Sequence, residues 1–211
     1  MIRTQRNRHL RSALGSALVA LLAISTAAAA QDASPQALYE AGQYDAVLAR
    51  VDAERGAGRE SLESAFMAAQ AARRLGQGDR VVQEYERLAS SPNPAWAALG
   101  RAGAALERGD LDQAQGAAGE AIGLEGGLGF AHYQLGMVHA RRNNHEAAGQ
   151  AFARAAELMP SFAYAHYYAG LSFQRVKNIN RMATHFEQFV QLAPNAPERT
   201  QVLVVLRSVR G

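Results

Sequence analysis

Two adjacent segments of equal length decide the fold: 129–162, GFAHYQLGMVHARRNNHEAAGQAFARAAELMPSF, and 163–196, AYAHYYAGLSFQRVKNINRMATHFEQFVQLAPNA. Four residue types recur between them at one spacing: His132 and His166, Gly136 and Gly170, Phe152 and Phe186, Pro160 and Pro194. A fixed period of this length is the signature of a repeat architecture. Each segment has room for two antiparallel helices, and proline ends the second because it cannot continue a helix.

The same period continues upstream in a weaker form. The turn between paired helices is expected at five positions, Gly42, Gly76, Gly109, Asn143 and Lys177. Cap patterns occur at Ser34-Pro35, at Asn93-Pro94, from Asp110 to Gln113 and from Asn195 to Glu198. After Pro197 the apolar run 201–209 predicts one more helix, which covers the last open face of a repeat array.

These segments resemble the tetratricopeptide repeat (TPR) family. The matching residues of the first segment are Leu135, Gly136, Ala148, Phe152, Ala155 and Pro160, and those of the second are Ala169, Gly170, Phe173, Phe186 and Pro194. The second segment departs from the pattern at Met182 and Phe189, where the family usually has small residues. The resemblance covers 129–196 most closely and 35–128 less closely. It implies an all-α, right-handed solenoid of antiparallel helix pairs, with about five units and a C-terminal capping helix.

The N-terminal segment 1–30 has the pattern of a cleavable secretory signal. Four arginines without an acidic residue precede an apolar run at 13–24, and small residues follow up to Ala30. We expect cleavage after Ala30, which leaves a TPR-like array at 31–196 and the capping helix at 197–211. An uncleaved anchor is the less favoured alternative, because a membrane span needs about 20 apolar residues. The pattern predicts an exported bacterial protein, located in the periplasm or, alternatively, secreted, with no stable membrane insertion after cleavage.

Composition narrows the function classes. The net charge of the chain is +3, and removal of the four arginines of the signal leaves −1, so nucleic acid is not an expected partner. The chain has no cysteine, which excludes disulfides, thiol chemistry and cysteine-ligated zinc.

The search for catalytic or metal-binding motifs favours a protein that is not an enzyme and has no cofactor or metal. His145-Glu146 begins like a zinc-protease motif, but Gly149 stands where the second histidine must be. His132 and His139 are two helical turns apart, which is too far for one metal ion without further ligands. Glu107 is the one acid at a groove-type position of the third unit, and the sequence shows no obvious second acid beside it.

The resemblance places a concave groove along the first helix of each unit. The groove residues expected to bind a partner are Phe130, Tyr133, Met137, Arg141, Tyr164, Tyr167, Tyr168 and Arg175. Aromatic residues and arginine are enriched at the hot spots of protein interfaces. The alternative is that several of these aromatics pack against the neighbouring repeat.

The sequence therefore predicts a scaffold or adaptor that binds a peptide or helix of another protein, in cell-envelope assembly or a multi-protein complex. Repeat arrays also self-associate through open ends, so a homodimer is compatible with the pattern. The alternative is an envelope enzyme, or a sugar- or peptidoglycan-binding protein, built on a helical solenoid.

Overall fold

The computed structural model of the chain describes residues 33–210, with the side chain of Arg210 excepted. The chain divides into two parts at Ser34, and the second part, Pro35–Gly211, contains all the described helices. The expected signal segment 1–30 lies outside the described residues. Within the described part, no helix is long and apolar enough to cross a membrane.

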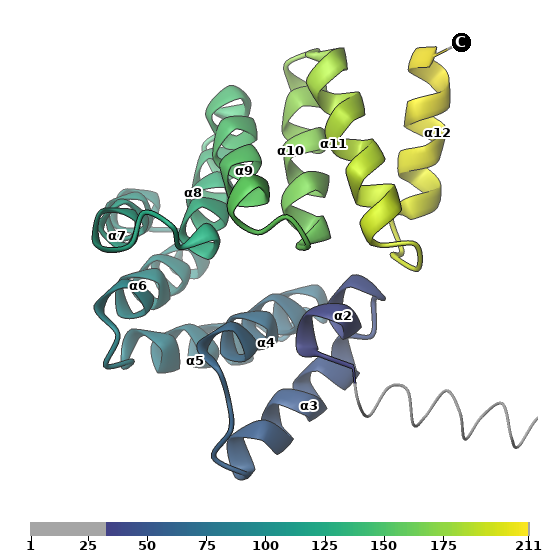
Figure 1. Cartoon of the computed structure of the whole chain (residues 1–211). Coiled ribbons are helices and arrows are strands. Elements are labelled where there is room, and N and C mark those ends of the chain that lie inside the picture. Colours follow the sequence, from purple (N-terminus) through teal and green to yellow (C-terminus); the bar gives the residue numbers. More distant parts are fainter. Residues whose placement is uncertain (1–32, 211) are drawn as a thin grey trace, which may run out of the picture. The chain divides into compact units, whose positions relative to one another are not determined.

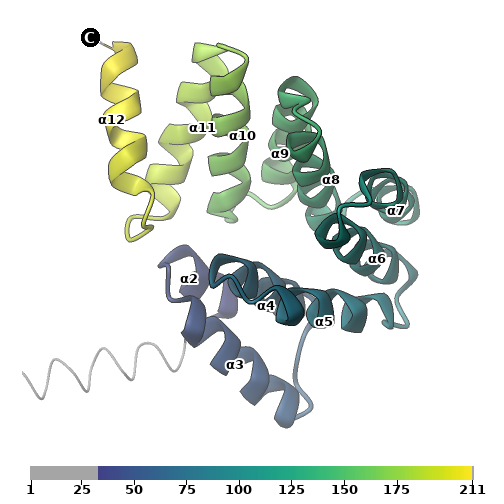
Figure 2. The same cartoon turned by 180° about the vertical axis from the view of Figure 1, so that it is seen from behind.

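The second part is all-α over its described residues and consists of helix pairs followed by one single helix (Figures 1 and 2). The helices are α2 (Pro35–Glu40), α3 (Tyr44–Gly56), α4 (Leu62–Arg74), α5 (Gly78–Ala89), α6 (Pro94–Arg108), α7 (Leu111–Leu124), α8 (Gly129–Arg141), α9 (His145–Leu158), α10 (Ala163–Arg175), α11 (Ile179–Leu192) and α12 (Arg199–Arg210). Consecutive helices pack against each other along the whole array. This arrangement confirms the predicted TPR-like solenoid of five helix pairs with a terminal helix.

The turns inside the pairs fall where the period predicts them. All five expected positions, Gly42, Gly76, Gly109, Asn143 and Lys177, have a positive φ, between 57° and 80°. Glycine adopts this left-handed conformation without strain, whereas a side chain such as that of Lys177 makes it costly. The repeat therefore imposes one backbone geometry on five different local sequences.

The glycines of the repeat create space for aromatic rings. A Cβ atom added at Gly136 would lie 2.7 Å from the ring of Phe152, and one added at Gly170 would lie 2.4 Å from the ring of Phe186. Both rings are fully buried. Within each of these pairs, the absence of a side chain on the first helix therefore lets the aromatic ring of the second helix reach the helix surface.

Of the four expected helix caps, two are confirmed by side-chain hydrogen bonds and one is wrong. The Asn93 side chain accepts hydrogen bonds from the backbone N–H groups of Ala95 and Trp96, and that of Asp110 accepts from Gln113. The capping box expected from Asn195 to Glu198 is the wrong one. α12 begins only after Glu198. The Glu198 carboxylate accepts hydrogen bonds from Arg74 of α4 and from the Tyr164 hydroxyl of α10, so it does not cap α12.

Gly100 in α6 offers the sharpest test of this packing. A Cβ atom at this position would lie 2.2 Å from the backbone nitrogen of Ala89 and 2.6 Å from the carbonyl oxygen of Tyr85. Because backbone cannot rotate away, we expect Gly100→Ala to lower the free energy of unfolding by about 1–3 kcal/mol in urea denaturation.

Gly119→Ala is the matched control for this substitution. Gly119 lies inside α7, and an added Cβ there would meet nothing within 4 Å. This substitution should raise the free energy of unfolding by about 0.5–1 kcal/mol, because alanine loses less backbone entropy in a helix. Equal effects of the two substitutions would contradict the packing described here.

Candidate binding surface

The inward faces of the first helices meet in a continuous aromatic core. Phe130 of α8 contacts Phe66 of α4 and Trp96 of α6, at ring-centroid distances of 4.7 and 5.6 Å. Tyr133, also on α8, packs against Phe162 at 5.4 Å. Ring pairs of this kind contribute about 0.5–1.5 kcal/mol each beyond their burial. The concave side is therefore filled by the chain's own side chains over α4, α6 and α8.

The first helix pair also contacts the last one. Tyr39 of α2 packs edge-on against Tyr164 of α10 at a centroid distance of 4.8 Å. Arg74, at the end of α4, forms an ion pair with Glu198 and donates a hydrogen bond to the Tyr164 hydroxyl at 3.2 Å. This hydroxyl donates in turn to Glu198 at 2.7 Å. In both views α2 lies beside the loop before α12 (Figures 1 and 2). We call this contact region the seam: Tyr39, Glu40, Arg74, Ala163, Tyr164 and Glu198.

Glu40 supplies a cap for α10 from the other end of the array. Phe162 stands at the N-cap position of α10 and has no side chain that accepts a hydrogen bond. The Glu40 carboxylate accepts one from the Ala163 N–H at 2.9 Å. The positive end of the helix dipole favours a negative charge at this position. Burial nevertheless raises the pKa of Glu40, although hydrogen bonds from Ala163 and Gln36 act in the opposite direction.

This closure corrects the expectation of an open aromatic groove. Phe130, Tyr133 and Tyr164 are only 9%, 0% and 0% exposed, so a partner cannot reach their side chains. The reason is the tight curvature of the array, which turns the first helices of distant repeats toward one another. For these three residues, the alternative that the aromatics pack against other repeats applies.

The other five predicted residues remain at the surface. Arg141 and Arg175 are exposed, whereas Met137, Tyr167 and Tyr168 are half-buried. Met137 packs against the apolar cluster of α6 and α7, and Tyr167 contacts Phe189 at 5.0 Å. The structure thus leaves a cationic and aromatic strip along α8 and α10, without the three buried aromatic residues that were predicted to bind a partner.

A small pocket opens between α8, α9 and α10 beside this strip. Its volume is about 160 Å³. Tyr168 and Phe152, whose rings stack at 5.4 Å, form part of an apolar wall. Drug-sized ligands need about 300–1,000 Å³, so this pocket fits one apolar side chain of a partner. Its lining residues are Ala140, His145, Phe152, Tyr168, Leu171, Ser172 and Arg175.

Four charged residues occupy the same position of successive repeats, one repeat period apart. The first two, Arg73 and Glu107, form an ion pair, with Nη2 and Oε1 2.6 Å apart. The next two, Arg141 and Arg175, form no ion pair or hydrogen bond with any residue of the described part. Glu107, the acid that the sequence places at a groove-type position of the third unit, is therefore already bound to an arginine. The two later arginines present unused positive charge at the surface, and Arg175 lines the pocket.

The histidines have local partners. His166 of α10 and His185 of α11 contact each other through their Nδ1 atoms at 3.1 Å, and His185 stacks on Phe173. Burial, and then the nearby His166 and Arg181, lower the pKa of His185 to about 4. Burial also lowers the pKa of His166. Among residues 33–210, no three of His, Asp and Glu lie together in an arrangement that could hold a metal ion.

The histidine pair predicts a loss of stability in acid. The folded state holds His185 neutral down to about pH 4, whereas the unfolded chain takes up a proton near pH 6.5. The contribution of this histidine to the free energy of unfolding is therefore at its maximum above about pH 6.5, and it decreases as the pH falls toward 4. Urea unfolding at pH 7 and pH 4.5 should show a smaller difference for His185→Gln than for the unmodified chain. An equal difference in both proteins would show that this pair does not titrate as described.

Sequence reasoning missed the seam. Neither the cap from Glu40 nor the contact between Arg74 and Glu198 is expected from the sequence, although Tyr164 and Glu198 lie one repeat period apart and occupy equivalent positions. The equivalent repeat positions of Tyr164 and Glu198 were the feature of the sequence that could have indicated this contact. The contact from Glu40 to Ala163 crosses 123 residues, and no local pattern reports on a contact of that kind.

Structural comparison gives the class of fold. The chain is similar to TTC0263, a thermophilic TPR protein of Thermus thermophilus, with a TM-score of 0.58 and 17% sequence identity over 81% of this chain and 92% of that one. At this identity the likeness shows the fold alone. The chain has the fold of the tetratricopeptide repeat proteins.

Two further solved structures are similar at lower TM-scores. YrrB, a TPR protein with an unusual peptide-binding site, gives a TM-score of 0.48 at 17% identity, over 81% of this chain and 87% of that one. MamA of Desulfovibrio magneticus RS-1 gives 0.45 at 19% identity, over 75% and 90%. Neither value supports an argument about function. No protein-family model and no curated protein sequence matches the chain.

Proposed function

We propose that the chain is a protein-binding scaffold and that it binds its partner at the surface strip of α8 and α10. The strip comprises Met137, Arg141, Tyr167, Tyr168, Leu171 and Arg175. The observation that supports it best is the pair of exposed, unused arginines, of which Arg175 lines a small apolar pocket. The partner is a peptide or helix that places one apolar side chain in the pocket and carboxylates on Arg141 and Arg175.

The physical chemistry of the strip fits this role. An arginine binds a carboxylate through two parallel hydrogen bonds, and this geometry gives both affinity and orientation. In the second helix pair, Arg73 already binds a carboxylate, that of Glu107, from the same position of the repeat. A partner acid at Arg141 or Arg175 would repeat that interaction between molecules.

We further propose that this binding takes place outside the cytoplasm. The proposal is supported by the basic and apolar pattern of residues 1–30, which is typical of a secretory signal. An adaptor in cell-envelope assembly or in a periplasmic complex is the role that combines this pattern with a binding strip. Fractionation of cells that express the chain with a C-terminal tag, followed by N-terminal sequencing, tests the location and the cleavage after Ala30.

Loss of the two arginines should weaken partner binding. We expect Arg141→Ala with Arg175→Ala to reduce the affinity for the partner at least about tenfold, because hot-spot arginines contribute more than about 1 kcal/mol each. Residues 31–211 would be used to capture the partner from an envelope extract. Calorimetry with the purified partner would then give the dissociation constants.

Arg101→Ala with Arg154→Ala is the matched control, since both are exposed arginines outside the strip and the change in net charge is the same. It should bind like the unmodified chain. If both double variants bind with the same affinity, the partner site lies elsewhere and the proposal fails.

A further inference from the structure

The first helix pair buries fewer residues than the pairs that follow. α2 buries Pro35, Leu38 and Tyr39, and α3 buries only Val47 and Val51. By contrast, α4 alone buries nine residues and α6 buries eleven. Segments with few buried apolar side chains open locally at a lower free energy than the rest of a protein. The first pair is therefore the part of the array that detaches most easily.

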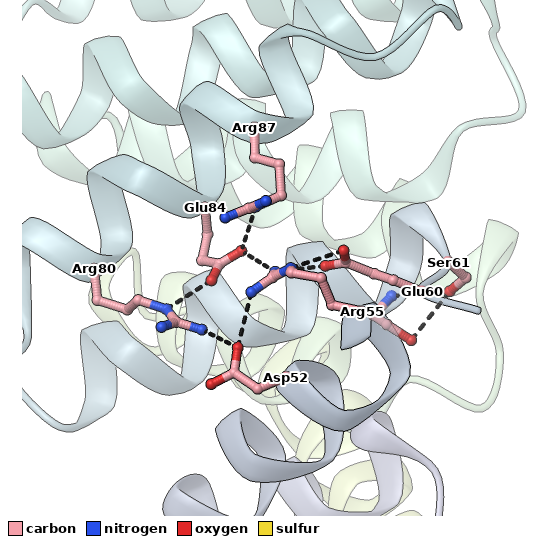
Figure 3. A network of polar contacts seen from close by, with 8 residues as sticks. Asp52, Arg55, Glu60, Ser61, Arg80, Glu84 and Arg87 are labelled. Atoms are coloured by element: carbon pink, nitrogen blue, oxygen red, sulfur yellow. Dashed lines mark hydrogen bonds and ion pairs between the residues drawn. The ribbon is translucent and has the colours of Figure 1, made fainter. Parts of the chain in front are cut away.

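Charged contacts hold α3 to the next pair (Figure 3). Arg55 of α3 forms an ion pair with the buried carboxylate of Glu84 of α5 at 2.7 Å. Arg80 of α5 forms an ion pair with Asp52 of α3 in the opposite direction. Salt screens partly exposed ion pairs of this kind. The connection to α4 contains Gly58, which has a φ of +67° and open space around it, so the link itself does not restrain the pair.

On its other side, the first pair behaves like a ligand bound to α10. Tyr39 places its ring against Tyr164, and Glu40 places its carboxylate on the Ala163 N–H. Gln36 adds a hydrogen bond to the backbone oxygen of Ser161 at 3.0 Å. An aromatic residue followed by an acid is thus the chemistry that this surface of α10 accepts, and Arg74 adds a positive charge beside it.

We infer that the N-terminal end of α10, with Arg74 and Glu198, is a second docking surface, occupied in this structure by the chain's own α2. A partner segment that carries an aromatic residue followed by an acid displaces α2 and takes its contacts. This surface adjoins the strip of α8 and α10 through the ring contacts of Tyr164 with Tyr167 and Tyr168. The contacts of α2 described above do not involve Arg141 or Arg175, so the inference does not depend on the proposed function.

The test supplies α2 as a separate peptide. The receptor is the chain 31–211 with Tyr39→Ala and Glu40→Ala, which weakens the internal occupant, and the probe is a fluorescent peptide of residues 33–43, ASPQALYEAGQ. We expect the peptide to bind this variant at least about tenfold more tightly than the unmodified chain, in which α2 competes. The same peptide with both residues changed to alanine should not bind.

Hydrogen exchange locates the binding. In the variant, the amide of Ala163 loses its acceptor and should exchange faster, whereas the amides of 129–158 should stay as protected as in the unmodified chain. Addition of the peptide should restore the protection at Ala163. A receptor that also carries Arg141→Ala and Arg175→Ala should bind the peptide equally well, which separates the two surfaces.

Three results would overturn the inference. They are equal binding of the peptide to the variant and the unmodified chain, no binding to a variant with full helical content, and unchanged exchange of Ala163. If the double variant does not fold, Glu40→Leu retains the Tyr39 ring and removes only the cap. Faster exchange at Ala163 in that variant, reversed by the peptide, supports the inference, and no change overturns it.

Discussion

Aromatic packing between helices of non-consecutive repeats determines the form of this array. Phe130 of α8 contacts Phe66 of α4, two repeats earlier, and Tyr164 of α10 contacts Tyr39 of α2. In a simple solenoid each repeat contacts only its neighbours. Here the interior rings join repeats that are far apart in sequence, and they remove the space in which a peptide would otherwise lie.

This packing separates the two surfaces on which binding is proposed. The strip on α8 and α10 stays accessible because Arg141 and Arg175 project from the ends of their helices, beyond the aromatic core. The surface at the start of α10 is covered by α2, through one ring contact and several polar ones. The first surface is already exposed, whereas the second becomes accessible only when α2 is displaced.

The period in the sequence predicts local features well and long-range ones poorly. It places the turn at Asn143 and Lys177, residues with no intrinsic preference for turns as strong as that of glycine, because the repeat spacing carries the information. It also identifies Gly136 and Gly170 as sites of close approach. Curvature, however, depends on small angles between successive helices, and these add up over five pairs. The burial of Tyr133 and Tyr164 and the cap that Glu40 provides for α10 follow from that curvature and have no local signature.

The closed form of the array is the central claim, and one distance tests it most directly. The chain has no cysteine, so a cysteine introduced at Gln43 and another at Asn195 can carry the only two spin labels. Both residues are exposed, and they flank the contact between Gly42 and Pro197. The structure predicts a single, narrow and short distance distribution in electron–electron double resonance. A broad distribution centred at long distances would show that the first and last helix pairs do not meet in solution.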